Sequence, residues 1–446
     1  MSDRETIAAI ATPAGRGGIG VIRVSGKGVD ALAHQLIGCL PRPREATLSC
    51  FRDRDGNILD QGIALYFPAP GSYTGEDVLE LQGHGGPIVL QLLLNQCLKN
   101  GARLARPGEF TERAFLNGKL DLAQAEAVAD LIDSSSEQAA RAAQRSLQGE
   151  FSRRVSSLVE QLIQLRAYVE SAIDFPDEEI DFLCDDGLLG KLDGILLSTQ
   201  TLLSTARQGR LLNEGMVVVL AGRPNAGKSS LLNALAQIDR AIVSDTPGTT
   251  RDTIELHITI DGMPVTLIDT AGLRKVADAL EIEGVRRTHA AVKDADLVLY
   301  IVDDSDERII DRDPAIPSAV PCTVVFNKID ISNRPGGQFS FDGRDTLAIS
   351  ATGGQGLQEL REHLKIKGGY QEIEGSEFIA RTRHLDAIRL TQQHIIEGRK
   401  QLTEAGAGEL LAEELRLAQR SLSEITGAFT SDQLLGTIFA TFCVGK

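Results

Sequence analysis

The sequence of 446 residues predicts an α+β domain, followed by a helical domain into which an α/β domain is inserted. Three observations indicate this. Short apolar runs mixed with glycine and proline fill residues 1–118. Helical periodicity dominates residues 119–210 and 370–446, which we expect to be two halves of one domain. Strand-like and helix-like stretches alternate in residues 211–369, as in a parallel sheet covered by helices.

The elements of the first domain are bounded by turn residues. Residues 19–24, 62–67 and 78–81 are short, mainly apolar runs, which predict strands. Residues 87–98 have apolar side chains at helical spacing, and the leading proline suits the first turn of a helix.

The flanking halves are predicted to be helical. Residues 120–132 follow a helical period, with Asp121, Glu126 and Asp130 on other faces. The same pattern predicts further helices at residues 151–173, 188–207 and 409–425.

The inserted domain contains apolar runs that are typical of buried parallel strands. They lie at residues 216–220, 265–268, 297–302, 323–326 and 347–349.

The bulk composition is that of a globular protein, with 42% apolar and 24% charged residues. The 46 basic and 62 acidic residues give a net charge of −16, which argues against passive adhesion to nucleic acid or anionic membranes. A local basic patch is still compatible with this total.

The six cysteines show neither a C-x-x-C spacing nor a zinc pattern, so we expect free thiols and a cytoplasmic location. The first ten residues lack a long apolar stretch, and no run of eighteen apolar residues occurs. We therefore expect neither a signal peptide nor a membrane span.

The strongest motif is a phosphate-binding loop. Residues 222–229 read G-R-P-N-A-G-K-S, which fits G-x-x-x-x-G-K-[ST] between a strand and the predicted helix 230–236. Backbone N–H groups and the helix N-terminus can hold phosphates there. Lys228 is expected to reach the β- and γ-phosphates, and Ser229 to hold Mg²⁺.

Two further elements face the phosphates. Asp269 follows a strand and is the expected second partner of Mg²⁺, while Gly272 lets the backbone approach the γ-phosphate. Thr250, in the polar stretch 248–252, is predicted to close onto Mg²⁺ and the γ-phosphate when GTP is bound.

The base-reading residues come from two strand ends. The carboxylate of Asp330 can accept the two donors that guanine, but not adenine, presents. Asn327 is expected to reach the base, Lys328 to cover the ring, and the Ser350–Ala351 backbone to bind the base oxygen. The inserted domain is therefore predicted to be a P-loop GTPase (G) domain.

Within this prediction, Lys228 and Thr250 act in catalysis. The residues expected to contact the nucleotide are Asn225, Ala226, Gly227, Lys228, Ser229, Ser230, Ser244, Thr249, Thr250, Asp269, Thr270, Ala271, Gly272, Asn327, Lys328, Asp330, Ser350 and Ala351.

The G-domain motifs resemble those of translation-factor-like GTPases, with Leu273 where Ras-like proteins carry a water-orienting glutamine. Over the whole chain, six further motifs resemble the MnmE (TrmE) family of tRNA modification GTPases. They are residues 15–20, 74–77, 83–87, 106–110, 174–179 and 442–446.

The resemblance implies an N-terminal folate-binding and dimerisation domain, a discontinuous helical domain and an inserted G domain. It also implies a homodimer that acts with the FAD-dependent protein MnmG as a heterotetramer. The pair would add carboxymethylaminomethyl or aminomethyl groups to the wobble uridine of certain tRNAs. The one-carbon unit would come from a 5-formyl- or methylene-tetrahydrofolate derivative.

The resemblance further implies hydrolysis by face-to-face G domains with K⁺ beside the phosphates, in the role of an arginine finger. Glu281 matches the glutamate that prepares the attacking water. The matching K⁺ ligands are Asn225, Ser244, Thr246 and Thr249.

The folate contacts that carry over are Arg23, Glu80, Lys119 and Lys446, each of which is an ordinary surface charge without the resemblance. Glu80 could bind the donor edge of the pterin, and the basic residues could hold anionic parts of the cofactor.

A second function remains open: a GTP-controlled ribosome-assembly or binding switch with slow hydrolysis. The G domain alone does not separate the two, and the flanking domains favour tRNA modification. Arg381, Arg383 and His384 are a candidate tRNA contact, with a solvated helix face as the alternative.

Overall fold

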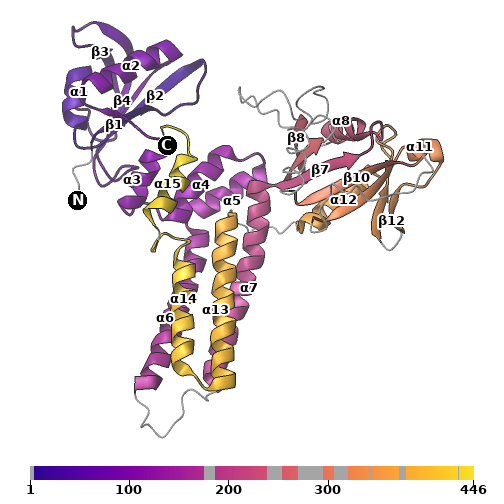
Figure 1. The fold of residues 1–446 in the computed structure, drawn as a ribbon. Coiled ribbons are helices and arrows are strands. Elements are labelled where there is room, and N and C mark those ends of the chain that lie inside the picture. The colour runs from indigo at the N-terminus through magenta and orange to yellow at the C-terminus, as the bar shows by residue number, and fades with distance from the viewer. Residues whose placement is uncertain are drawn as a thin grey trace, which may run out of the picture. The chain divides into compact units, whose positions relative to one another are not determined.

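The computed structural model describes residues 5–174, 186–238, 254–269, 295–305, 320–341, 344–370, 378–429 and 431–445. The chain divides into two compact units (Figure 1). The first comprises Met1–Ala129, Val155–Val159 and Gln419–Lys446, and the second comprises Asp130–Arg154 and Glu160–Ala418.

The first unit contains a six-stranded sheet in the order β3-β4-β5-β2-β1-β6. Neighbouring strands are antiparallel, except that β1 and β6 are parallel. The strands are β1 Ile7–Ile10, β2 Gly17–Ser25, β3 Thr47–Arg52, β4 Ile58–Phe67, β5 Val78–Gly85 and β6 Arg103–Leu104. All three strands predicted here are confirmed, and each is longer than its apolar run.

Two helices, α1 (Val29–Ile37) and α2 (Pro87–Lys99), pack on this sheet. The core holds alternate residues of the central strands, such as Ile22 and Val24, against Leu32 of α1 and others. The predicted helix 87–98 is α2, with proline in its first turn.

A second apolar cluster in this unit gathers α3 (Glu109–Leu116), α4 (Leu122–Asp133) and α15 (Asp432–Ala440). The C-terminal residues return to the sheet: the Gly108 N–H donates to the Cys443 carbonyl at 3.3 Å. A Cβ on Gly445 would lie 2.3 Å from the Ile10 carbonyl oxygen, so this tail packs closely against the end of β1.

The second unit contains a seven-stranded sheet in the order β12-β13-β11-β10-β7-β9-β8. The pairs β8–β9 and β12–β13 are antiparallel and the others are parallel. The strands are β7 Met216–Gly222, β8 Ile254–Ile260, β9 Met263–Asp269, β10 Leu297–Asp303, β11 Cys322–Asn327, β12 Gly337–Phe341 and β13 Arg344–Ala348. The five predicted strands of this domain are present, with the last one beginning earlier than expected.

Both faces of this sheet are covered, because residues of β7 alternate between two clusters. Val218 and Leu220 pack with α8 and α12, while Val219 and Ala221 face the other cluster. The helices in the described part of this unit are α5 Glu137–Leu147, α6 Glu150–Asp174, α7 Asp186–Glu214, α8 Lys228–Ile238, α11 Ile329–Ser332, α12 Leu357–Gly368, α13 Thr382–Ala405 and α14 Gly408–Ser423.

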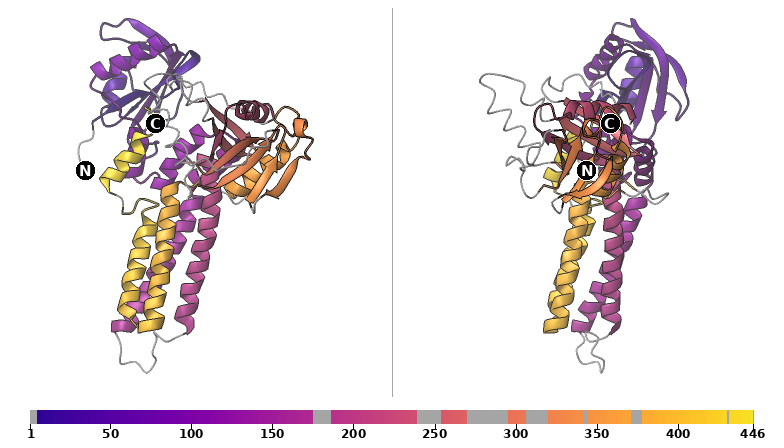
Figure 2. Two further views of the ribbon diagram at one scale, coloured as in Figure 1. Left: turned by 45° about the vertical axis from the view of Figure 1, so that its right-hand side comes forward. Right: turned by 90° about the vertical axis from the view of Figure 1, so that its right-hand side faces the viewer.

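Four long helices, α6, α7, α13 and α14, run side by side (Figures 1 and 2). Polar contacts join neighbours: His394 Nδ1 lies 2.6 Å from Glu414 Oε2, between α13 and α14. Arg399 of α13 pairs with Asp193 of α7 at 3.3 Å. Helix α7 continues to Glu214, directly before β7, so it extends beyond the predicted segment 188–207.

Several acidic and basic side chains expected at the surface are buried. Glu126 is 1% exposed and Asp130 is 6% exposed. Asp130 accepts hydrogen bonds from Arg381 at 2.7 Å and from Asn213 at 3.2 Å. His384 is 2% exposed, and its Nδ1 accepts from the Arg381 N–H at 3.0 Å. The solvated-face interpretation is therefore wrong for His384, which cannot present its side chain to RNA, while Arg381 is partly exposed and paired with Asp130.

In the described helices, no stretch has the length and apolar character to cross a membrane. Cys39, Cys50, Cys97, Cys322 and Cys443 are free thiols, as predicted; Cys184 lies outside the described residues.

Candidate functional site

The loop between β7 and α8 has a backbone that requires glycine at two positions. Gly222 has φ +136° and Gly227 has φ +93°. A Cβ would lie 2.2 Å from the Ile301 carbonyl oxygen at Gly222, and 2.2 Å from Asn327 Nδ2 at Gly227. Asn225 takes φ 65°, a left-handed conformation that asparagine tolerates better than most residues. The sequence thus produces the tight phosphate loop that its motif predicts.

Lys228 opens α8 and is only 5% exposed. Its Nζ donates to the carbonyls of Gly222 and Arg223, both at 2.9 Å. A buried ammonium is costly unless it is hydrogen-bonded, and these carbonyls provide that while keeping the charge at the loop.

The predicted Mg²⁺ partners lie together. Ser229 Oγ donates to Asp269 Oδ2 at 3.2 Å, and Asp269, at the end of β9, is 1% exposed. A hydroxyl and a carboxylate are hard oxygen donors of the type Mg²⁺ prefers, so this pair fits the ion. Ser230 is exposed on the next position of α8.

Asn327 joins the phosphate loop to the base loop. It ends β11, is 1% exposed, and donates through Nδ2 to the Ala226 carbonyl at 2.9 Å. Its Oδ1 accepts from the Ala351 N–H at 3.0 Å. A carboxamide has two N–H donors and two acceptor sites on its oxygen, so capacity for the base remains.

Asp330 and Ser350 form the second part of the base site. Ser350 Oγ donates to Asp330 Oδ1 at 2.6 Å and accepts from the Gly353 N–H at 2.8 Å. Ser350 is fully buried while Asp330 is exposed. The contact orients the carboxylate and leaves its other oxygen for the donor edge of guanine.

Lys328 is held in place by a residue that sequence reasoning missed. It has φ 68°, and its Nζ lies 2.5 Å from Asp303 Oδ2. Burial tends to raise the pKa of the Asp303 carboxyl, but hydrogen bonds from Lys328 and Ser305 hold this pKa below its ordinary value.

The neighbouring Asp304 was also missed. Arg334 pairs with it at 2.9 Å and stacks over Phe326 and Phe339, at 5.0 and 5.3 Å from their ring centres. The only signal in the sequence is that Asp303 and Asp304 lie at the carboxyl end of a strand, where ligand-binding residues of α/β sheets gather.

Several predicted site residues lie outside the described part of the chain. They are Ser244, Thr246, Thr249, Thr250, Thr270, Ala271, Gly272, Glu281 and Lys446. The K⁺ cage, the switch threonine and the water-preparing glutamate therefore remain predictions.

The predicted folate residues Arg23 and Glu80 are cross-strand neighbours on β2 and β5. They form an ion pair, with Arg23 Nη2 at 2.9 Å from Glu80 Oε1. The guanidinium lies over the rings of Tyr73 and Phe110, with 5.5 and 5.8 Å to the ring centres. Lys119 donates to the Pro70 carbonyl at 3.0 Å.

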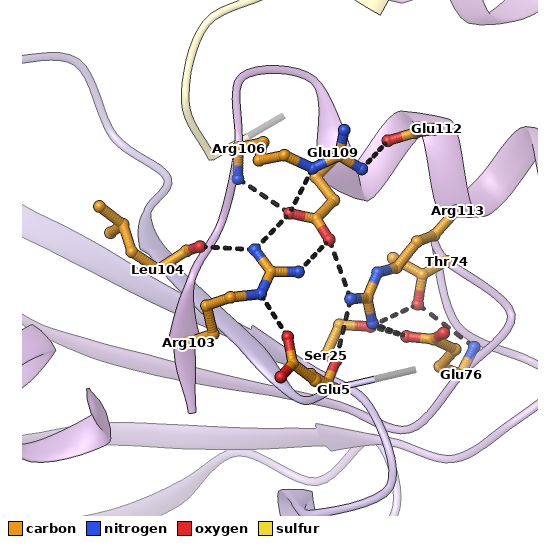
Figure 3. A network of polar contacts seen from close by, with 10 residues as sticks. All are labelled: Glu5, Ser25, Thr74, Glu76, Arg103, Leu104, Arg106, Glu109, Glu112 and Arg113. Carbon is orange, nitrogen blue, oxygen red and sulfur yellow. Dashed lines mark hydrogen bonds and ion pairs between the residues drawn. The ribbon is translucent and has the colours of Figure 1, made fainter. Parts of the chain in front are cut away.

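A polar network supports the aromatic residues around Arg23. Figure 3 shows Glu109 at its centre, with Arg103 donating at 2.7 Å and the buried Arg113 at 3.0 Å. Arg113 also donates to Glu76 at 2.8 Å. Burial alone would raise the pKa of Glu109, but these arginines and the Arg106 N–H lower it to about 2.

The network fixes α3 beside the sheet, because Glu109 lies in the first turn of this helix. The next residue, Phe110, is one of the two rings over Arg23, and Thr111 Oγ1 lies 2.9 Å from the hydroxyl of the other, Tyr73. Sequence reasoning used residues 106–110 only as a motif of the resemblance.

Comparisons with known proteins cover the whole chain. The model of the MnmE helical domain matches residues 122–443, and that of the GTP-binding protein TrmE N-terminus matches residues 6–119. The tRNA modification GTPase MnmE of Yersinia pestis bv. Antiqua (strain Angola) is 56% identical over 456 residues, with 100% of both chains covered. That of Stutzerimonas stutzeri (strain A1501) is 56% identical over 451 residues, or 99% of each chain.

Among solved structures, the G domain of the T. maritima FeoB iron transporter is 26% identical. It covers 34% of this chain and 98% of its own, with a TM-score of 0.25. The two family models and the full-length relatives agree with the motifs and the geometry of the nucleotide site. The chain therefore belongs to the MnmE (TrmE) family of tRNA modification GTPases.

Proposed function

We propose that this tRNA modification GTPase is K⁺-dependent and works in the cytoplasm as a homodimer with a FAD-dependent, MnmG-type partner, as a heterotetramer. Together they install carboxymethylaminomethyl or aminomethyl groups on the wobble uridine of certain tRNAs, with the one-carbon unit from a 5-formyl- or methylene-tetrahydrofolate derivative. The observation that carries the GTPase part is the link through Asn327, because it joins the phosphate loop and the guanine loop into one site.

At the phosphates, Lys228 supplies a fixed positive charge at the base of the loop, and loop N–H groups surround the phosphate oxygens. Ser229 and Thr250 hold Mg²⁺, with Asp269 bonded to Ser229. When bound, Mg²⁺ neutralises charge on the β- and γ-phosphate oxygens. Thr270, Ala271 and Gly272 contact the nucleotide, with the Gly272 backbone donating to the γ-phosphate. Glu281 prepares the attacking water.

The position of Asn225 supports the proposed K⁺ site. It is exposed at the tip of the phosphate loop, where a side-chain oxygen can reach a cation beside the phosphates. Ser244, Thr246 and Thr249 complete the oxygen cage. A cation there stabilises the charge that develops during hydrolysis.

At the folate site, Arg23 and Glu80 form the fixed part. The ion pair uses Glu80 Oε1, so Oε2 is the oxygen that binds the donor edge of the pterin. Lys119 and Lys446 hold the anionic end of the cofactor. Tyr73 and Phe110 keep the Arg23 guanidinium in place.

The test is steady-state GTP hydrolysis in K⁺ and in Na⁺ at equal ionic strength, for the unaltered chain and for Asn225→Gly. We expect strong stimulation by K⁺ alone, lost in Asn225→Gly while GDP affinity is kept. Glycine is chosen because it adopts the positive φ of this position without strain. Arg223→Ala, an exposed neighbour in the same loop, is the matched control and should keep the stimulation.

Equal and slow rates in both salts would contradict the K⁺ mechanism. The nucleotide site would stand, and the assembly-switch function would then be the better explanation.

A further inference from the structure

A cleft of about 630 Å³ lies within the second unit, between the C-terminal parts of α7 and α12 and the start of α13. Its charged lining consists of Arg207, Arg210, Lys367 and Arg389, and no carboxylate is among the described lining residues. The chain as a whole carries a net charge of −16, so a lining whose charged residues are all cationic differs in sign from the chain as a whole.

Among the described residues, carboxylates pair with three of these four cations. Arg210 pairs with Glu214 at 3.4 Å, Lys367 with Asp345 at 3.2 Å, and Arg389 with Asp386 at 3.0 Å. All three pairs are solvent-accessible, and such pairs exchange easily for another anion because each contributes about 0–1 kcal/mol. Arg207 is exposed and makes no ion pair with the described residues.

The walls of the cleft are held rigidly. Gln208 Nε2 donates to the Gly369 carbonyl at 2.6 Å, which ties α7 to the end of α12. The Thr382 N–H donates to Glu214 at 3.1 Å, which ties the start of α13 to α7. Preformed cationic walls lose little conformational entropy when an anion binds.

The rest of the lining suits a sugar-phosphate strand better than a free nucleotide. Ser204, Thr205 and Thr382 line the cleft with hydroxyls. Ser204 and Thr205 donate to the Thr201 carbonyl at 2.8 and 3.1 Å and Thr382 donates to Glu214 at 3.0 Å, so each hydroxyl would have to turn to bind a phosphate oxygen. The apolar lining consists of Leu211 and Leu385, and the described lining holds no aromatic ring on which a base could stack.

We propose that this cationic cleft, formed by Arg207, Arg210, Lys367 and Arg389, is a contact site for the phosphate backbone of tRNA. The inference rests on the tRNA part of the function and adds the surface that holds the RNA. In an acidic chain, RNA has to be held where the local charge is reversed, because the phosphate backbone dominates RNA affinity.

The test uses the full-length chain with GDP and a fluorescently labelled unmodified tRNA, with binding followed by anisotropy between about 50 and 200 mM salt. The variants are Arg207→Glu and Arg389→Glu, alone and together. Lys400→Glu is the matched control, because it makes the same charge change at an exposed position about three turns further along α13. GTP hydrolysis and the thermal midpoint are measured on each preparation.

We expect each cleft variant to weaken tRNA binding on the order of 10-fold and to reduce the salt slope by about one, with the double variant weaker still. Lys400→Glu should bind like the unaltered chain, and GTP hydrolysis should not change in any of them. Equal tRNA affinity in the cleft variants and the control would overturn the proposal. Loss of hydrolysis in the unaltered chain would instead contradict the GTPase function.

Discussion

At the scale of single residues, guanine recognition depends on the carboxylate of Asp330. Ser350 binds one carboxylate oxygen at 2.6 Å, and Ser350 itself is fixed by the Gly353 N–H. The carboxylate is therefore oriented before the base arrives. A site built to bind polar groups of its ligand discriminates strongly, because a mismatch leaves donors or acceptors unpaired.

Asp330→Asn should change the base preference of the site. The new amide presents a donor where guanine also presents one, so we expect GDP affinity to fall on the order of 100-fold or more. Xanthine carries a carbonyl at that position, so affinity for xanthosine diphosphate should rise. Nucleotide titration with GDP, XDP and ADP measures both changes. Ser350→Ala is the control: it should weaken GDP binding less and leave the preference for guanine intact. Unchanged GDP affinity in Asp330→Asn would rule out the assigned role.

The residues of the nucleotide site were predictable where a motif fixes their place on a strand or loop. Lys228, Asp269 and Asp330 follow from this logic, because each lies at the carboxyl end of a buried strand or at a helix start. Asp303 also ends a strand, but its contact with Lys328, which follows the neighbouring strand β11, could not be predicted from the sequence. The burial of Asp130 could not be predicted, because its partner Arg381 is 251 residues away along the chain.

At the scale of elements, helix α3 is attached to its sheet both by charge and by Phe110, which packs with Ile7 and Ala9 of β1. Glu109 is 3% exposed and receives hydrogen bonds from Arg103, Arg106 and Arg113. Buried ion pairs of this kind are strongly destabilised when one partner is removed, because the remaining charges stay buried without compensation.

Glu109→Gln should lower the free energy of unfolding of the first unit on the order of 3 kcal/mol. Glu112→Gln is the matched control, since Glu112 is more exposed and has one ion pair, to Arg106 at 2.7 Å. Loss of this ion pair in Glu112→Gln should lower the free energy of unfolding by about 0–1 kcal/mol. Urea denaturation of both variants makes the comparison. Similar losses of unfolding free energy in the two variants would show that the hydrogen bonds to Glu109 do not hold α3 on the sheet.

The same carboxylate sets an acid limit on stability. The pKa of Glu109 falls from 4.5 to about 2 in the folded chain. The ionised Glu109 therefore contributes fully to the stability of the fold above the pKa that it has in the unfolded chain. This contribution is lost as the pH falls from about 4.5 towards 2. The difference between the unaltered chain and Glu109→Gln should shrink over this range.

Most elements were predictable from periodicity, and their ends were not. The apolar run at 216–220 predicts β7 but not its continuation to Gly222, because the last residues belong to the phosphate loop. Helix α7 exceeds the segment 188–207 because Leu211 and Leu212 pack in the core beside Met216. Because these residues are buried by segments distant in the sequence, the local sequence does not show whether they continue the helix or form a linker.

At the scale of the whole molecule, the second unit combines long helices and the G-domain sheet through the end of α7. Leu211 and Ile379 both belong to the core that contains β7. Next to them, Gly209 packs so closely on the segment before α13 that a Cβ would lie 1.9 Å from the Phe378 carbonyl oxygen. This contact is one described route by which movement of the nucleotide-binding strands can reach the long helices.

Gly209→Ala should weaken that junction. The added methyl group must displace the Phe378 backbone, and overpacking of this kind costs about 1–3 kcal/mol. Gly194→Ala, on the same helix with open space around its Cβ position, is the matched control. It should be neutral or stabilising by about 0.5–1 kcal/mol, because alanine favours the helix. Hydrogen exchange of the full chain should show faster exchange in β7 and at the start of α13 for Gly209→Ala only. If both variants exchange alike, the close contact at Gly209 does not join the helices to the G-domain core.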